Sequence, residues 1–248
     1  MGFWDKIRNY TRSLSSGGTG TNLGKLQGII GYHFRDELLA LLAVTHRSFY
    51  RGNDSERPSN ERLEFLGDSV LGLVIADQLF RDNPNLREGE LTKTKAMLVN
   101  ELTLASIGKE VGLNELIRLS TEEDRLGGRE RPSIISDAFE SILGAVYLDG
   151  GLDAVRDVIL RLIYVRRDAI TSDRSQRNFK GELLELTQSR GEGMPRYDVV
   201  SEHGPDHEKE FSIVVFISNQ KVGAGRGSSK KEAEQEAASR ALERMKEH

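Results

Sequence analysis

The feature of this sequence that most constrains its fold is a change in the spacing of apolar residues. From Leu26 to about Tyr164, apolar residues recur every three or four positions, which is the period of amphipathic helices. Three later stretches alternate apolar and polar residues, as half-buried antiparallel strands do, and helical patterns flank them. The alternating stretches are 197–203, 209–218 and 220–229, and the flanking helical patterns are 179–190 and 230–248. The sequence therefore predicts a mainly α protein, in which an all-helical domain precedes a small α-β-β-β-α domain.

Composition predicts where these domains begin and end. Residues 1–24 end in SLSSGGTGTNLG, a stretch rich in Gly, Ser and Thr that is typical of a flexible extension. Residues 166–177 are polar and charged, as expected of a linker. We therefore expect the helical domain at 25–165 and the second domain at 178–248. The main helices of the first domain are predicted at 36–46, 60–80, 91–113, 134–150 and 152–170.

Composition also limits the kinds of site and location. The chain contains no cysteine, so disulfides and thiolate metal sites are excluded, and any metal must have oxygen or histidine ligands. No window approaches the roughly 18 apolar residues of a membrane span, and the N-terminus lacks the apolar core of a signal peptide. We therefore expect a cytoplasmic protein with no membrane partner. The formal net charge of −4 means that any surface for nucleic acid is local rather than global.

Two acidic stripes carry the strongest functional signal. In NERLEFLGDSVLG, Glu61, Glu64 and Asp68 fall at i, i+3 and i+7, so they share one face of a helix. In SDAFESILGAVYLDG, Asp137 and Glu140 share a face at i, i+3, among largely apolar neighbours. Like charges on one stripe repel one another. The pattern predicts that the two helices meet and direct their carboxylates toward a common cation.

Carboxylate ligands without sulfur favour Mg²⁺, for which Mn²⁺ can substitute. For any single acid the alternative is a solvated surface residue or a helix cap, but the paired spacing of the set favours a cation site. A di-iron centre would need Glu-x-x-His pairs, whereas the pairs here end in Glu64 and Glu140. We expect no organic cofactor.

The residues around these stripes resemble the bacterial-type ribonuclease III family. NERLEFLGDSVL is similar to the signature of that family, and DAFESILGAVYLDGG is similar to its second acidic helix. LGKLQGIIGYHFRDELLALLAVTHRS, with its THRS turn at 45–48, resembles the opening helices. The resemblance covers roughly residues 25–248. It implies an all-helical endonuclease domain that works as a homodimer, with one acidic cluster in each subunit.

The resemblance also implies roles for single residues. The metal ligands would be Glu64, Asp68, Asp137 and Glu140, with Asp68 and Glu140 catalytic and Glu61 a supporting acid. Phe65 would either pack in the core or insert into a pocket on the partner subunit. Metal ions would activate a water for in-line attack on a phosphodiester, leaving 5′ phosphate and 3′ hydroxyl ends.

The C-terminal segment resembles the double-stranded-RNA-binding domain in three regions. The first helix keeps Glu185 and Gln188 but has Gly181 and Leu184 where the family usually offers hydroxyl or amide groups. The loop after the first strand would enter a minor groove, and the start of the last helix would face phosphates across the major groove. These two regions contribute Gly204, Pro205, Asp206, His207, Ser228, Ser229, Lys230 and Lys231.

The prediction is a metal-dependent endoribonuclease that cuts double-stranded RNA during processing of ribosomal and other structured precursor transcripts. The main alternative is a non-catalytic double-stranded-RNA-binding or ribosome-associated protein, in which we would expect losses among the five acids. A helical dimer with no RNA role does not account for the second domain. Duplex DNA is disfavoured because it lacks 2′ hydroxyls.

Overall fold

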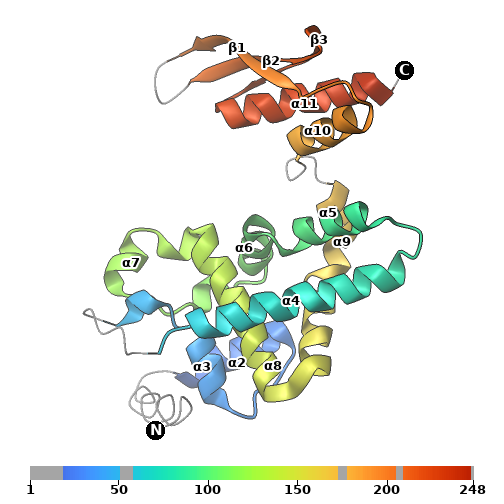
Figure 1. Ribbon diagram of the computed structural model, residues 1–248. Coiled ribbons are helices and arrows are strands. Elements are labelled where there is room, and N and C mark those ends of the chain that lie inside the picture. Colours follow the sequence, from blue (N-terminus) through green and yellow to red (C-terminus); the bar gives the residue numbers. More distant parts are fainter. Residues whose placement is uncertain (1–18, 51–57, 173–177, 205–208, 247–248) are drawn as a thin grey trace. The chain divides into compact units, whose positions relative to one another are not determined.

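The structure is a computed structural model that describes residues 19–50, 58–172, 178–204 and 209–246. It divides into two compact units, Met1–Arg174 and Ser175–His248, and each unit is described by itself. The first is helical and the second contains a three-stranded antiparallel sheet with helices, which confirms the predicted fold class (Figure 1). Within the described part of the chain, no helix is long and apolar enough to cross a membrane.

The described residues of the first unit form α-helices joined by short 3₁₀ turns. Its helices are α2 (Thr19–Ile30), α3 (Glu37–Ala43), α4 (Glu61–Asp82), α5 (Glu88–Val99), α6 (Glu101–Glu110), α7 (Thr121–Arg125), α8 (Pro132–Leu162) and α9 (Arg167–Ser172). The 3₁₀ turns are η1 (Arg47–Phe49), η2 (Asn114–Leu116), η3 (Gly128–Glu130) and η4 (Tyr164–Arg166).

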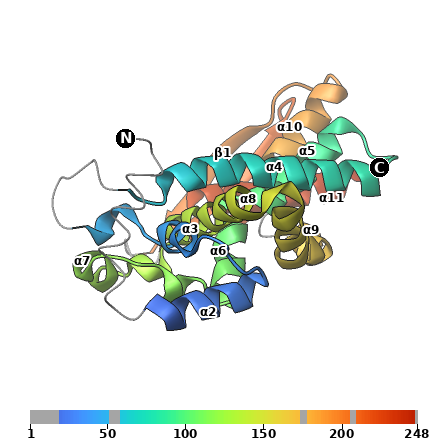
Figure 2. The ribbon, with the colours of Figure 1, turned by 90° about the horizontal axis from the view of Figure 1, so that it is seen from below.

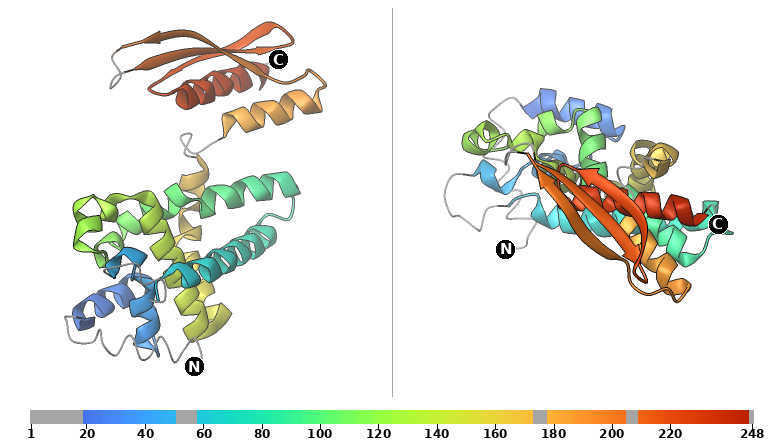
Figure 3. Two further views of the ribbon diagram at one scale, coloured as in Figure 1. Left: turned by 60° about the vertical axis from the view of Figure 1, so that its left-hand side comes forward. Right: turned by 90° about the horizontal axis from the view of Figure 1, so that it is seen from above.

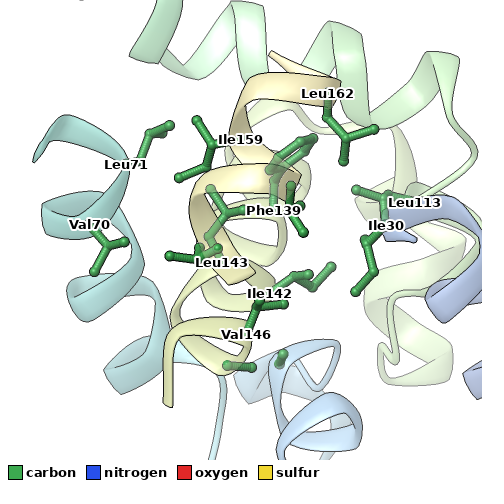
Figure 4. Close-up of a cluster of buried hydrophobic side chains, with 14 of the residues drawn as sticks. Ile30, Val70, Leu71, Leu113, Phe139, Ile142, Leu143, Val146, Ile159 and Leu162 are labelled. Atoms are coloured by element: carbon green, nitrogen blue, oxygen red, sulfur yellow. The ribbon is translucent and has the colours of Figure 1, made fainter. Parts of the chain in front are cut away.

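Helix α8 lies at the centre of this unit because it is apolar on nearly every face. Figure 4 shows its buried side chains between two partners, with Val70 and Leu71 of α4 on one side and Ile30 of α2 and Leu113 on the other. Figure 2 shows α4 lying beside α8 in a second view. The two helices that carry the acidic stripes therefore pack directly against each other.

The N-terminal boundary differs from the prediction. Helix α2 begins at Thr19, so the last residues of the expected flexible extension are helical. Leu26 and Ile30 are buried in the core, and Leu23 packs against it at the same helical spacing. The Gly- and Thr-rich composition of this segment is overridden by three apolar residues that share one face of the helix. Residues 1–18 lie outside the described part of the chain.

Two helix boundaries also have local causes. The helix expected at 91–113 is divided at Asn100, whose side chain accepts a hydrogen bond from the Thr103 N–H (2.8 Å) and so caps α6. The predicted break between 134–150 and 152–170 appears as a kink at Gly151, whose φ of 82° is one that glycine adopts without steric strain.

The second unit places two helices on one face of its sheet. The elements are α10 (Phe179–Ser189), β1 (Arg196–His203), β2 (Glu210–Ile217), β3 (Gln220–Gly227) and α11 (Lys230–Lys246), and the strand order is β1-β2-β3 (Figure 3). Ile213 and Val215 of β2 pack against Ala237 of α11 and Leu183 of α10. At Ser218 and Asn219, φ is 48° and 66°, the backbone of a tight hairpin turn between β2 and β3.

Candidate active site

Helices α4 and α8 approach each other at two glycines. A Cβ atom on Gly67 would collide with the carbonyl oxygen of Glu140, and one on Gly144 would collide with the carbonyl oxygen of Leu63. Only glycine permits such a close backbone approach at both positions. The acidic turn of α8 is therefore held at backbone contact distance from the acidic turns of α4.

A buried junction connects these helices to the turn that follows α3. The Ser141 hydroxyl, at α8, bonds to the carbonyl oxygens of Asn60 (3.1 Å) and Asp137 (2.6 Å). The Asn60 N–H donates to the carbonyl of Thr45 (3.0 Å), and its own carbonyl accepts the N–H of Glu64 (2.9 Å) at the start of α4. The Asn60 side-chain amide is buried, and its nitrogen has no hydrogen-bond partner among the described residues. Three segments thus meet beside the acids.

The four predicted metal ligands act on one another electrostatically. Burial raises the pKa of Glu140 to about 8, and the charges of Asp68, Glu64 and Asp137 add to the rise. Burial also raises the pKa of Glu64, with Asp137 as the next cause. The pKa of Asp137 is raised by burial and then by the charge of Glu101, against a smaller opposing effect of the Ser136 hydroxyl. The fold therefore brings together acids that lie about 70 positions apart in the sequence.

The side chains do not by themselves form a finished metal site. In the part of the chain that the structure describes, no three or more His, Cys, Asp or Glu side chains are grouped closely enough to hold one ion. The two helix backbones hold the acidic turns side by side, whereas the carboxylate groups of the described acids are not gathered around one point.

Glu61 lies apart from this group in its contacts. One carboxylate oxygen accepts a hydrogen bond from the Ser59 hydroxyl (2.8 Å), and the other faces the Arg47 guanidinium (3.5 Å). Both oxygens are engaged with neighbours on its own side of the site. The charge of Glu61 still contributes to the raised pKa values of Glu64 and Asp137.

Phe65 lies on the surface, with 78% of its area exposed, so it is not part of the core of its own chain. Leu73 and Phe80 of the same helix are 57% and 71% exposed. Their spacing of eight and seven residues places all three on one side of α4. We call these three residues the α4 stripe.

In the second unit, the predicted RNA contacts lie in three places. Glu185 and Gln188 are exposed on α10. Gly204 has a φ of 101° at the end of β1, and three further predicted contacts, Pro205, Asp206 and His207, lie outside the described residues.

The start of α11 presents two exposed lysines on a capped helix. The Ser229 hydroxyl accepts the N–H of Glu232 (3.2 Å), and the Ser228 N–H and hydroxyl donate to the Glu232 carboxylate (2.9 and 2.7 Å). Both serines therefore serve the helix cap. Lys230 and Lys231 are exposed, and the Lys230 ammonium lies 5.7 Å from the centre of the Phe211 ring.

The sequence matches two protein-family models, one in each unit. A model described as Ribonuclease-III-like matches residues 36–166, and one described as Double-stranded RNA binding motif matches residues 179–245. Relatives named Ribonuclease 3 include one from Aliarcobacter butzleri, 41% identical over 92% of this chain and 99% of the relative. Another, from Caldanaerobacter subterraneus subsp. tengcongensis, is 45% identical over 89% of this chain and 96% of the relative. The chain belongs to the ribonuclease III family.

A solved structure supports the same assignment. The nuclease domain of ribonuclease III from Campylobacter jejuni is 42% identical, with a TM-score of 0.53, and the match covers 57% of this chain and 95% of that domain. These matches confirm the predicted family and function, an endoribonuclease that acts on double-stranded RNA. Enzymes of the ribonuclease III family generally depend on divalent metal ions.

Two residues of this ribonuclease III site escaped the sequence analysis. Glu101 begins α6 and acts on Asp137, but the helix predicted at 91–113 placed it in mid-helix. The signal that could have found it is Asn100, a residue type favoured at helix N-caps. The sequence gives no separate signal for Asn60, because its burial depends on the tertiary contact with Ser141.

Proposed function

We propose that Glu64, Asp68, Asp137 and Glu140 hold divalent ions, with Mg²⁺ as the best fit, and that the cluster hydrolyses phosphodiester bonds of double-stranded RNA. The products would carry 5′ phosphate and 3′ hydroxyl ends. One observation carries the proposal: Glu140 is a half-buried acid whose pKa is raised to about 8 by burial and by three other carboxylates from two helices. Such repulsion is unfavourable unless a cation offsets it.

The donor set fits a hard cation. All four side chains offer carboxylate oxygens, and the chain has no cysteine. When bound, the ion supplies an activated water and neutralises charge that develops on the phosphate. Glu64, Asp68 and Asp137 would bind it. Glu140 carries a proton on its carboxyl group near neutral pH and would release that proton when the ion binds. Asp68 and Glu140 would be the catalytic acids.

The decisive test compares four incubations of the full chain. A perfect RNA duplex and its DNA counterpart are each given Mg²⁺ or EDTA, and labelled ends are analysed. We expect cleavage only of RNA with Mg²⁺, with 5′ phosphate on the products. Cleavage of RNA in EDTA would contradict the metal assignment.

A single variant tests the assignment of the acids. Glu140→Gln removes one carboxylate of the cluster and leaves the second unit unchanged, so we expect loss of cleavage with unchanged duplex binding. Glu115→Gln, at an exposed position of η2, is the control for charge loss. Normal cleavage by Glu140→Gln would refute the proposed ligand set.

We further propose that the enzyme is a homodimer joined through the α4 stripe. Two exposed phenylalanines and a leucine on one helix face form an apolar surface of the kind that protein interfaces cover. The Campylobacter jejuni nuclease domain was described with a region involved in dimer formation. In a two-fold dimer, each subunit would bring one acidic cluster to one strand of the duplex.

For the whole chain, we propose a nuclease domain at 25–165 extended back to Thr19, a linker at 166–177 and an RNA-binding domain at 178–248. Helix α10, the loop from Gly204 and the start of α11 would contact the duplex by shape. The substrates would be ribosomal and other structured precursor transcripts. We place the enzyme in the cytoplasm, where a bacterial transcript folds.

A further inference from the structure

One cation stands beside the acidic cluster. Arg47 begins η1, its side chain is 73% exposed, and its guanidinium lies 3.5 Å from Glu61, its one ion-pair partner among the residues that the structure describes. The other oxygen of Glu61 is held by Ser59. An exposed pair of this length adds little stability, because water screens it. The pair therefore matters through where it places the guanidinium rather than through stability.

The turn that carries Arg47 is held by contacts with a neighbouring segment. The His46 ring nitrogen Nδ1 lies 2.8 Å from the Ser48 hydroxyl, which also accepts the N–H of Ser120 (3.2 Å). The backbone N–H of His46 donates to the backbone carbonyl of Arg118 (3.1 Å). The Arg118 guanidinium lies 4.1 Å from the centre of the Phe49 ring. Residues on both sides of Arg47 are thus bound to a neighbouring segment, while its own side chain projects into solvent.

The charge of Arg47 reaches the acids of both helices. It lowers the pKa of Glu64 on α4 and that of Asp137 on α8, against the larger effects that raise them. Arg47 therefore lies at the rim of the cluster and not only beside Glu61. Glu61 takes up one N–H group of this guanidinium among the described residues, and the planar fork of an arginine matches the oxygens of a phosphate.

We propose that Arg47 binds a phosphate of the RNA strand that lies over the acidic cluster, and that Glu61 holds the guanidinium in place for it. The ligand is the pair of non-bridging oxygens of one phosphodiester. This inference rests on the proposed function, since it requires RNA at the acids. It also gives Glu61 a defined task, the positioning of Arg47, in a site where it holds no metal.

The first test measures cleavage of an RNA duplex by the full chain over a range of salt concentrations. Arg47→Ala should raise KM about tenfold, the effect of losing one charge-assisted hydrogen bond, with a smaller effect on kcat. The salt dependence of binding, measured with Ca²⁺ in place of Mg²⁺, should flatten by about one phosphate contact. Arg47→Lys should restore the salt slope but only part of the affinity, because it keeps the charge and loses the planar fork.

The matched control is Arg35→Ala. Arg35 is also exposed, and its backbone N–H bonds to Asp149, 12 residues along α8 from Asp137, or about 18 Å at the helical rise. We expect it to leave KM and the salt slope unchanged. A purely structural role for Arg47 would lower thermal stability and kcat without altering the salt slope, and that result would overturn the proposal.

A second test asks whether Glu61 acts through Arg47. Glu61→Gln alone should raise KM, whereas in the Arg47→Ala background it should have no further effect. Additive effects would overturn the positioning role of Glu61. If the unmodified chain fails to cleave RNA with Mg²⁺, the proposed function itself is wrong; if it cleaves and Arg47→Ala behaves identically, only this inference fails.

Discussion

At the scale of single residues, Glu140 links the site to the stability of the fold. Its pKa is about 8 in the native chain, compared with an ordinary value of 4.5. Between these two values the native chain holds a proton that the unfolded chain has released. Stability conferred by that proton is full below pH 4.5 and is lost as the pH rises toward 8. The acidic cluster therefore destabilises the metal-free fold at neutral pH and above.

This linkage predicts a pH-dependent gain from one substitution. In EDTA, the free energy of unfolding of the helical unit should fall between pH 5 and pH 8, and Glu140→Gln should remove part of that fall. The gain at pH 8 should be roughly 1–3 kcal/mol, after allowance for partial exposure of the side chain. Urea unfolding followed by circular dichroism at both pH values measures it, with Glu115→Gln as the surface control. An equal gain at pH 5 and pH 8 would mean that titration of Glu140 is not the cause.

At the scale of helices, the contact between α4 and α8 determines whether the acids can meet. Gly67 and Gly144 each face backbone atoms of the other helix, so any side chain at either position separates the helices. Gly28 of α2 offers a contrast, because a Cβ atom there would meet nothing within 4 Å. Gly67 and Gly144 are thus required because no side chain fits between the helices, whereas the position of Gly28 has room for one.

The paired substitutions have opposite expected signs. Gly144→Ala should destabilise the nuclease unit by about 1–3 kcal/mol through overpacking and should lower cleavage by more than its loss of stability explains. Gly28→Ala should stabilise the chain by about 0.5–1 kcal/mol, since alanine is the better helix former, with cleavage unchanged. Thermal unfolding and initial cleavage rates of both variants provide the measurement. Equal cleavage by Gly144→Ala and the unmodified chain would show that close helix contact is not needed.

The same helices show which parts of the site the sequence can predict. The spacing of Glu64 and Asp68, and of Asp137 and Glu140, predicted that each pair shares a helix face, and period-two alternation located the three strands. Spacing reports which side of a helix is apolar, but not how closely two helices approach. The contact at Gly67 and the charge of Glu101 beside Asp137 both depend on tertiary packing. The early start of α2 has the same origin, because packing overrides local composition.

At the scale of the whole molecule, the division of labour between the two units can be tested at α11. Replacing Lys230 and Lys231 together with Ala should weaken duplex binding by the full chain and flatten its salt dependence by about two contacts. Arg244→Ala is the control, since this exposed residue lies 14 positions along α11, or about 21 Å away. Filter binding across salt concentrations gives the slope. An unaltered slope in the double variant would remove both lysines from the interface.

Assembly is the other whole-molecule property, and it depends on the α4 stripe. Full burial of a phenylalanine side chain is worth about 1.5–3 kcal/mol, so Phe65→Ala should weaken dimerisation about tenfold or more. Leu102→Ala, at a residue of α6 that is 62% exposed, should leave dimerisation unchanged. Light scattering over a concentration series measures the dissociation constant. Because each subunit would cut one strand, the Phe65→Ala monomer should release nicked duplexes where the dimer makes double-strand cuts. Paired cuts by a protein that light scattering shows to be monomeric would place the second acidic cluster somewhere other than a partner subunit.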